Sequence, residues 1–351
     1  MLNRRQMLKA GAAALGVGHA PSAFAQPQPD SIAVMTWGGL WGDSLQAGVD
    51  SKFLQQHGVR VVQDRGSSPV ERIAKMRVNA GNQLFDLVQL HDGLWPLAIA
   101  QDAVEPLDPR GRNLTHMADV YPRMVHSHWI AQIFSAVGLC YNTREVKSPP
   151  AAWADLWRPE FRGRIVLPEV SHSIGTYIVP IGAIAAGKDA KDAEAGFDMF
   201  QRMVKLDPIF ARDTDSMMSA LTTGEAVIGL LYKSQTFTIR DRGAPVEWVL
   251  PREGAISISW GTGIAKGTKH RDLAEKYIDL TLDAQTQTHF ARAFNYAGSN
   301  RRMLDLLDPK LRERVQLSDA DIARLIDLDH AFMSQNRTAW TDRWNRAVAG
   351  R

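Results

Sequence analysis

The chain has a single cysteine, Cys140, among its 351 residues. With no second cysteine, no disulfide can form within the chain and no cysteine-based metal site can be built. Cys140 lies in the apolar run 136–141, where a free thiol behaves as a small hydrophobic side chain. We therefore expect this cysteine to be buried and structural.

Long apolar runs are also missing after the N-terminal segment. That segment carries Arg4 and Arg5, then a short apolar run over 10–17, then the cleavage pattern Ala23-Phe24-Ala25. This order is typical of a secretory signal peptide, and the paired arginines resemble the signal of the twin-arginine export route. The apolar run is shorter than the roughly 20 residues that span a bilayer. We expect residues 1–25 to be a signal peptide cleaved near Ala25, which places the mature protein in the periplasm.

The mature chain has no net charge. The full chain has 41 basic and 38 acidic residues, and the signal peptide contains Arg4, Arg5, Lys9 and no acid. Removal of the signal therefore leaves 38 residues of each sign. A balanced charge makes nucleic acid an unlikely partner, so we expect no nucleic-acid binding.

Several catalytic and metal-binding motifs are absent as well. The sequence has no G-x-S-x-G, no H-E-x-x-H and no P-loop. His126 and His128 would share one face of a strand, but no third ligand accompanies them. We expect no catalytic residue, no metal site and no cofactor.

Alternating strand and helix patterns fill the remaining chain. Strands are expected at 32–36, 59–63, 85–90, 164–168, 226–232 and 246–251, and helices at 43–56, 69–80, 153–157, 174–187, 193–205, 272–294 and 319–348. Two extended runs, 133–141 and 256–264, have no helix beside them and suit crossover strands between lobes. This pattern predicts an α/β fold, and about 325 mature residues favour two lobes.

The first strand ends in Trp37-Gly38-Gly39-Leu40-Trp41, after which a helical pattern begins. Open α/β sheets bind ligands at such strand-to-helix turns, so the two tryptophans could grip a ligand. Alternatively, both could be core residues beside a tight turn.

A series of motifs recurs in the order found in one family. The motifs are Trp37-Gly38-Gly39, the strand 85–88, Gly138-Leu139-Cys140-Tyr141-Asn142-Thr143, the Trp-rich segment 153–165, Leu221-x-x-Gly224-Glu225, Pro251-x-x-Gly254-Ala255 and Ala274-x-x-Tyr277-Ile278-Asp279. The chain resembles a periplasmic solute-binding protein of an ABC importer, of the spermidine/putrescine-binding branch. The resemblance covers essentially the whole mature chain.

The resemblance implies a two-lobed periplasmic binding protein of type II, with a ligand cleft between lobes joined by two crossover strands. Lobe 1 would comprise 26–136 and 258–298, and lobe 2 would comprise 137–257 and 299–351. The implied partners are a small-molecule ligand and the transmembrane subunits of an ABC permease, and the protein is expected to be a monomer.

The resemblance also implies the ligand contacts: Trp37, Leu40, Trp41, His91, Asp92, Glu169, Ser173, Tyr232, Trp260 and Tyr296. Asp92 has a competing role as the cap of the helix that follows it. Ser173 and Trp260 replace residues that are acidic in the polyamine binders, so the site has aromatic rings but few carboxylates. The resemblance places either Asp329 or His330 near the last contact position.

An aromatic box with few acids would neutralise an extended polyamine poorly. A smaller or singly charged amine fits better. The sequence leaves several ligand classes possible: quaternary amines, thiazolium-like rings, simple diamines, and small acids that would bind Arg212 or helix N-termini. We expect a binding protein and no enzyme. The alternative is a periplasmic enzyme on the same fold that acts on a small amine or sugar acid.

Overall fold

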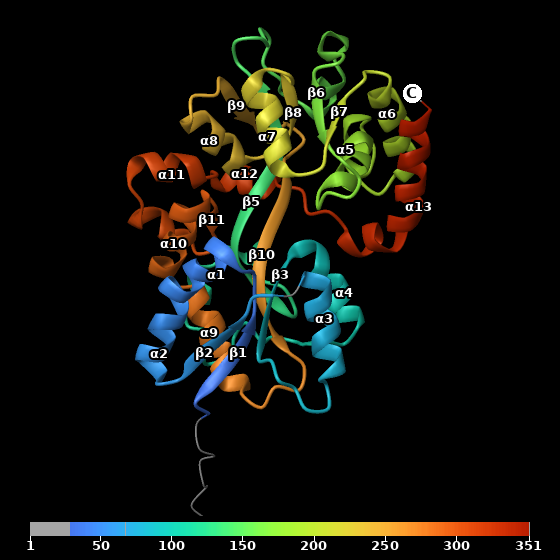
Figure 1. Ribbon diagram of the computed structural model, residues 1–351. Coiled ribbons are helices and arrows are strands. Elements are labelled where there is room, and N and C mark those ends of the chain that lie inside the picture. Colours follow the sequence, from blue (N-terminus) through green and yellow to red (C-terminus); the bar gives the residue numbers. More distant parts are fainter. Residues whose placement is uncertain (1–28, 67, 351) are drawn as a thin grey trace, which may run out of the picture.

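The computed structural model describes residues 29–66 and 68–350, and the expected signal peptide, 1–25, lies outside them. It shows two lobes, one above the other, that share a single mixed sheet of 11 strands (Figure 1). The strand order is β2-β1-β3-β10-β5-β8-β6-β7, and three short strands pair with it at β5 and β10. The expected α/β fold with two lobes is confirmed.

The strands of the sheet are β1 (Ser31–Met35), β2 (Arg60–Asp64), β3 (Leu87–His91), β4 (Val104–Glu105), β5 (Trp129–Asn142), β6 (Ile165–Pro168), β7 (Ile209–Ala211), β8 (Ile228–Tyr232), β9 (Val246–Val249), β10 (Ile256–Ala265) and β11 (Ala297–Gly298). Parallel pairs join β1 to β2 and β3, and β6 to β7 and β8. Each lobe therefore contains a parallel unit of the kind that strand–helix alternation builds.

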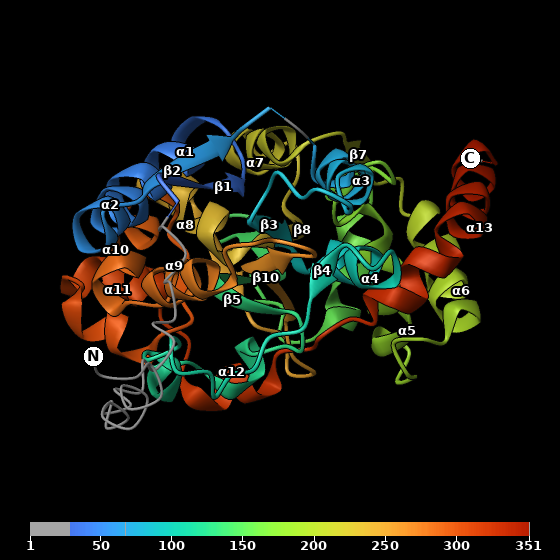
Figure 2. The same ribbon diagram turned by 90° about the horizontal axis from the view of Figure 1, so that it is seen from below.

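The α-helices are α1 (Gly39–Leu45), α2 (Ser51–His57), α3 (Pro69–Val78), α4 (Trp95–Ala100), α5 (Ile178–Ala185), α6 (Ala193–Val204), α7 (Thr214–Thr223), α8 (Lys233–Asp241), α9 (Arg271–Thr281), α10 (Ala284–Phe294), α11 (Pro309–Val315), α12 (Asp319–Arg324) and α13 (His330–Ala349). Seen from below, α2 and α10 lie on one side of the first lobe's strands, and α3 and α4 lie on the other (Figure 2). Among the residues that the structure describes, no helix combines the length and the hydrophobicity needed to cross a membrane.

Two long strands run through both lobes and confirm the expected crossovers. All 14 residues of β5 are buried. Its first part pairs with β10 from Trp129 to Val137, and its last part pairs with β8 from Val137 to Tyr141. A strand buried on both faces reads as a continuous apolar run, which is why this segment was recognisable in the sequence.

The hydrophobic cores follow the two lobes. The first core draws mainly on 32–136 and 264–325, and the second lobe has a core on each face of its strands. Met303, Leu311 and Ile322 pack in the first core, whereas the second begins again at Leu328. This packing differs from the expected assignment of 299–351 to lobe 2. Residues 299–325 stay with the first lobe because they follow β11, whose residues pair with the first-lobe half of β5, and the chain from Leu328 onward packs in the second lobe as expected.

Three expected helices are interrupted. The helix expected at 43–56 contains a π-helical turn, Gln46–Asp50, between α1 and α2. The helix expected at 272–294 breaks at Asp283, whose side chain caps α10 by accepting from the Thr286 N–H at 3.0 Å. The helix expected at 319–348 is two helices, because Ile326 leaves the helix and pairs with Ile256 of β10.

Candidate ligand-binding site

Three of the expected ligand contacts lie along one edge of the first lobe's sheet. Trp37 follows β1, His91 ends β3, and Trp260 of β10 is paired with His91. These strands are adjacent in the order β1-β3-β10, and neighbouring strands lie about 4.8 Å apart. Trp37, His91 and Trp260 are far apart in the sequence, but their strands lie side by side in the sheet.

Aromatic rings form a continuous cluster at this edge. Trp37 packs edge-on against Trp41 at 4.9 Å, Trp41 lies 6.4 Å from Trp260, and Trp260 stacks on Tyr296 at 4.6 Å between ring centroids. Trp41 and Tyr296 are each 9% exposed, whereas Trp37 and Trp260 are half-buried. Trp37 and Trp260 therefore present ring surface, and Trp41 and Tyr296 support them from behind.

A β-bulge places Trp260 at the seam between the lobes. The register of β10 against β5 shifts between Trp260 and Gly261, and such bulges redirect side chains next to binding sites. A β-carbon on Gly261 would lie 2.4 Å from the carbonyl oxygen of Ile130, so only glycine fits. Trp260 packs against the core of the first lobe and against that of the second.

A buried polar network that the sequence did not reveal holds Trp41. The Gln89 Oε1 accepts from Trp41 Nε1 at 2.9 Å and from Thr36 Oγ1 at 2.6 Å, while Gln89 Nε2 donates to Gln132 Oε1 at 3.0 Å and to Thr262 Oγ1 at 3.2 Å. Buried polar side chains are costly unless they are paired in this way. The network fixes Trp41 as a supporting residue.

The second lobe contributes hydroxyl groups. The Ser173 Oγ lies 3.4 Å from the Tyr232 hydroxyl at the end of β8. Burial raises the pKa of the Tyr232 phenol, and the charges of Tyr296 and Asp92 add to the effect. Burial likewise raises the pKa of Tyr177, with a contribution from Asp92, and the Tyr177 ring lies 6.1 Å from the ring of His330. Tyr177 was missed because its apolar surroundings suggest a core residue.

Asp92 is held by two backbone N–H groups. Its Oδ1 accepts from Gly93 at 2.8 Å, and its Oδ2 accepts from Ser259 at 2.8 Å. The same carboxylate lies 3.8 Å from His91 Nδ1 and 3.7 Å from Nε2 of His330, which begins α13. Asp92 thus combines a local structural role with a negative charge at the contact between the lobes.

Two expected contacts stand apart from this group. Leu40 is 58% exposed at the start of α1, and Glu169 is half-buried after β6. Within 29–66 and 68–350, no hydrogen bond, ion pair or ring contact joins either side chain to the aromatic cluster. Of the other eight expected residues, the structure joins Trp37, Trp41, Trp260, Tyr296, His91 and Asp92 through ring contacts, strand pairing and a close charge pair, and it joins Ser173 to Tyr232 in the second lobe.

His126 and His128, the pair with strand spacing, have separate partners in the structure. His126 stacks on Trp129 at 3.9 Å, and His128 Nδ1 lies 2.8 Å from Ser127 Oγ. No group of three or more histidine, cysteine, aspartate or glutamate side chains suited to a metal ion occurs in the described part of the chain.

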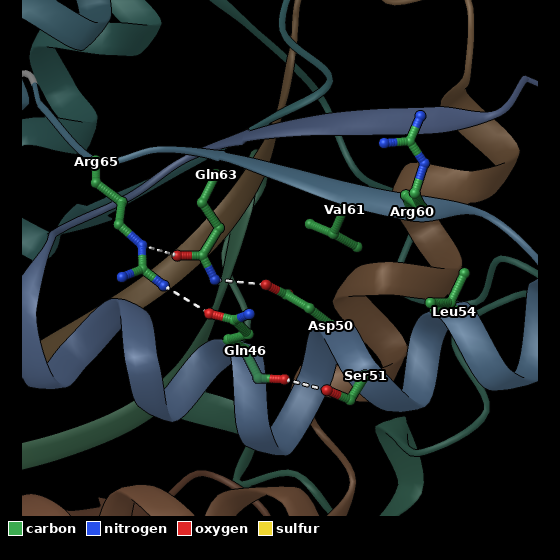
Figure 3. Close-up of a pocket in the computed structure, with 8 residues that line it drawn as sticks. All are labelled: Gln46, Asp50, Ser51, Leu54, Arg60, Val61, Gln63 and Arg65. Atoms are coloured by element: carbon green, nitrogen blue, oxygen red, sulfur yellow. Dashed lines mark hydrogen bonds between the residues drawn. The ribbon is translucent and has the colours of Figure 1, made fainter.

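A separate pocket of about 410 Å³ lies between β2 and the α1–α2 region (Figure 3). Its notable group is Asp50, 7% exposed, whose pKa is raised by burial. The Asp50 Oδ1 accepts from the Tyr277 hydroxyl at 2.9 Å, and Oδ2 accepts from Gln63 Nε2 at 2.5 Å. Both oxygens are engaged within the first lobe, which supports a structural role for this carboxylate.

Comparisons with known proteins agree with this architecture. A family model described as bacterial extracellular solute-binding protein matches residues 82–310. The spermidine/putrescine-binding periplasmic protein of Escherichia coli (strain K12) is 22% identical over 316 residues, which is 88% of this chain and 87% of that protein. The gamma-aminobutyric acid-binding protein of Pseudomonas aeruginosa is 23% identical over 343 residues, which is 93% of this chain and 95% of that protein.

A solved structure of an ABC transporter protein from Clostridium perfringens ATCC 13124 superposes with a TM-score of 0.79 at 24% identity, covering 90% of this chain and 99% of that one. Such similarity establishes the two-lobed type II fold. Because the family model spans more than half of the residues, the chain belongs to the family of bacterial extracellular solute-binding proteins, and it is a binding protein rather than an enzyme.

Proposed function

We propose that the protein is the periplasmic substrate-binding component of an ABC importer. It captures a small nitrogenous solute between its lobes, as a monomer, and delivers it to the transmembrane permease. The observation that carries this proposal is the position of Trp260, which packs against both cores and stacks on Tyr296 at the seam.

The relatives support the class of solute. One is named for spermidine and putrescine and another for gamma-aminobutyric acid, and all three compounds carry amino groups. In this chain, the Asp92 carboxylate lies 3.7 Å from Nε2 of His330, whose ring lies 6.1 Å from the ring of Tyr177. A carboxylate next to ring faces is a suitable environment for an ammonium group.

Ligand capture would couple to a hinge motion. Among the described strands, only β5 and β10 run continuously through both lobes, and Trp129 to Val137 of β5 pair with Ile256 to Gly263 of β10. Bending at these strands changes the distance between the second-lobe pair, Ser173 and Tyr232, and the first-lobe residues Trp37 and Trp260. Closure of this kind is the usual response of two-lobed binding proteins to their ligands.

The test is a binding titration of the mature protein, followed by tryptophan fluorescence and by calorimetry, against amines, amino acids and vitamins. Saturable binding of a nitrogenous compound that is recovered unchanged supports the proposal. Absence of binding to any nitrogenous compound would contradict it, and so would chemical conversion of the bound compound.

A further inference from the structure

Two imidazole rings flank the carboxylate of Asp92 at the contact between the lobes. Nδ1 of His91 lies 3.8 Å from Oδ1 of Asp92, and Nε2 of His330 lies 3.7 Å from the same oxygen. The side chains of His91, Asp92 and His330 are 28%, 11% and 14% exposed. Salt screens partly buried charges much less than exposed ones, so a change of charge in this group acts strongly on its contacts.

The three side chains come from both lobes. His91 ends β3 of the first lobe, and Asp92 follows it. His330 begins α13, and Trp340 of this helix packs in the core of the second lobe. Both rings lie against Gly93, because a β-carbon there would be 3.0 Å from Cε1 of His91 and 3.6 Å from Nδ1 of His330. The pair formed by Asp92 and His330 therefore joins the two lobes directly.

Histidine is the side chain that changes charge between about pH 5 and pH 8, and the other titratable groups influenced by Asp92 do not respond in the same way. The ring of Tyr177 lies 6.1 Å from that of His330, and burial raises the pKa of this phenol, with a contribution from the charge of Asp92. Burial also raises the pKa of Tyr232, so both phenols stay neutral. Burial lowers the pKa of His126, on which the charge of Asp92 also acts, so this ring is mostly neutral at pH 6.5 and above.

The acids that precede α13 have cations of their own. Asp329 binds Nζ of Lys191 at 2.6 Å, and this hydrogen bond lowers the pKa of its carboxyl. Asp327 binds Nη2 of Arg123 at 2.7 Å. Asp92 differs, because no lysine or arginine within 29–66 and 68–350 forms an ion pair with it. The neighbouring imidazoles are thus the groups that can balance its charge.

From this arrangement we propose that Asp92 and His330 form a pH-sensitive contact between the lobes. When His330 is neutral, Asp92 carries an unbalanced charge. When His330 takes up a proton, its imidazolium pairs with Asp92 and holds the start of α13 against the loop after β3. Acid therefore favours the arrangement of the lobes seen in the structure, and loss of the proton loosens it. His91 shares the lobe of Asp92, so its proton balances charge without joining the lobes.

This contact links solute capture to pH, a consequence that rests on the proposed function. A protonated His330 occupies the carboxylate that an ammonium group of a solute would use. It also opposes the separation of the lobes through which a solute enters the site. Capture of a cationic solute is thereby weakened in acid and strengthened as the proton is lost. The contact itself forms whichever solute the protein binds.

Small-angle X-ray scattering of the mature protein without solute tests the contact. The radius of gyration of the wild type should be larger at pH 8.5 than at pH 5.5, because the lobes separate when the ion pair is lost. His330→Asn, which cannot take up a proton at this position, should show the larger value at both pH values. His57→Asn is the matched control, because His57 ends α2 within the first lobe, and this variant should keep the wild-type pH response.

A double-mutant cycle of His330→Asn and Asp92→Asn shows whether the effect passes through this pair. At pH 5.5, His330→Asn should lower the melting temperature of the wild type by roughly 1–3 °C, the effect of one partly buried ion pair. In the Asp92→Asn background the same substitution should have less effect. At pH 8.5 its effect should be the same in both backgrounds.

An equal radius of gyration of the wild type at both pH values overturns the inference. So does a folded His330→Asn variant that keeps the wild-type pH response or shows the smaller value at both pH values, and so do additive effects of the two substitutions at pH 5.5. Where Asp92→Asn is unfolded, scattering from the wild type and from His330→Asn decides alone. None of these measurements uses a solute, so a negative result leaves the proposed function to its own binding titration.

Discussion

The Asp92 carboxylate accepts a hydrogen bond from the backbone N–H of Ser259 at 2.8 Å, which connects the loop after β3 to the residue that precedes Trp260. One oxygen of this carboxylate thus orders β10 next to a candidate ligand contact. The other accepts from Gly93 and faces His330 of α13. Asp92 therefore holds β10 in place and also puts a negative charge beside α13.

Asp92→Asn separates the charge of this residue from its structural role. The asparagine oxygen can keep one backbone hydrogen bond, so we expect a modest loss of stability. Loss of the negative charge should weaken binding of an amine by roughly tenfold to a hundredfold, measured by calorimetry. A folded variant with wild-type affinity for every amine would show that Asp92 acts only in local structure.

Trp37→Ala and Trp260→Ala should each weaken solute binding. Trp37 is half-buried, so its removal should leave the protein folded, whereas Trp260 supports both cores and its removal should also lower the melting temperature. Affinity is measured by calorimetry and folding by circular dichroism.

The matched control for these two variants is Trp157→Ala. Trp157 is a half-buried tryptophan of the second lobe whose Nε1 donates to the Met199 carbonyl at 2.8 Å. The Trp157→Ala variant should be less stable than the wild type but should bind the solute with the same affinity. If Trp37→Ala and Trp260→Ala both bind like the wild type, the solute site lies elsewhere.

Gly261→Ala tests the bulge that positions Trp260. The new β-carbon would lie 2.4 Å from both the Ile130 carbonyl oxygen and a ring carbon of Trp129. Backbone must move to relieve this contact, so we expect a loss of about 2 kcal/mol or more in the free energy of unfolding, from urea titration. Gly81→Ala is the control, because no atom lies within 4 Å of its new β-carbon. Equal stability of the two variants would contradict a steric requirement for glycine in β10.

The strands at the site edge were predictable, because buried strands leave apolar runs and their ends are marked by glycine or polar residues. The position of Trp37 after β1 and of His91 at the end of β3 follows from this pattern alone. The burial of Arg72 of α3, which is 1% exposed with its guanidinium carbon 4.4 Å from the centroid of the Trp37 ring, was not recognisable, since an arginine within an amphipathic helix normally faces solvent. Its burial depends on the tertiary position of Trp37, which no local pattern encodes.

The break between α12 and α13 illustrates a second limit. Apolar residues continue at helical spacing from 319 to 348, so the sequence favours one helix. In the structure, the Ser257 N–H donates to the Ile326 carbonyl at 2.9 Å, and this pairing with a strand more than 60 residues away replaces the helix locally. Long-range strand pairing overrides local propensity here.

His116 should stabilise the protein more at acidic than at alkaline pH. Its hydrogen bond with Asp279, 2.9 Å from Nδ1, raises the pKa of the imidazole, with further contributions from Asp283. A raised pKa in the folded state gives stability that is complete below the unfolded value of about 6.5 and lost as the pH rises through the folded value. The melting temperature of His116→Asn should therefore fall further below wild type at pH 5.5 than at pH 8.5.

His57→Asn provides the control of opposite sign. Burial and the nearby charge of Lys276 lower the pKa of His57, so the folded state releases its proton before the unfolded state does. The melting temperature of His57→Asn should therefore fall further below that of the wild type at pH 8.5 than at pH 5.5. If the melting-temperature differences of the two variants change with pH in the same direction, the raised pKa of His116 and the lowered pKa of His57 cannot both be right.

Lys233 connects the lobes and should make stability rise at alkaline pH. It follows Tyr232 in the second lobe, and its Nζ donates to the carbonyl oxygens of Arg314 and Gln316, which pack with the first lobe. Burial, together with the charge of Arg240, lowers the pKa of Lys233 from 10.5 to about 8. Between these values the unfolded state holds a proton that the folded state has released, so the free energy of unfolding increases with pH.

Lys233→Met removes this titration while keeping the length of the side chain. The difference in unfolding free energy between wild type and Lys233→Met should increase by about 2 kcal/mol from pH 7.5 to pH 10, measured by urea titration at each pH. Asp321, an acid whose charge acts on Lys233, has a pKa lowered by its hydrogen bonds with Arg324 and Ser318, so it stays ionised over this range and does not mask the effect. A difference that stays constant or decreases would show that the Lys233 ammonium is not desolvated in the folded protein, and that the contact with 314–316 is open to water.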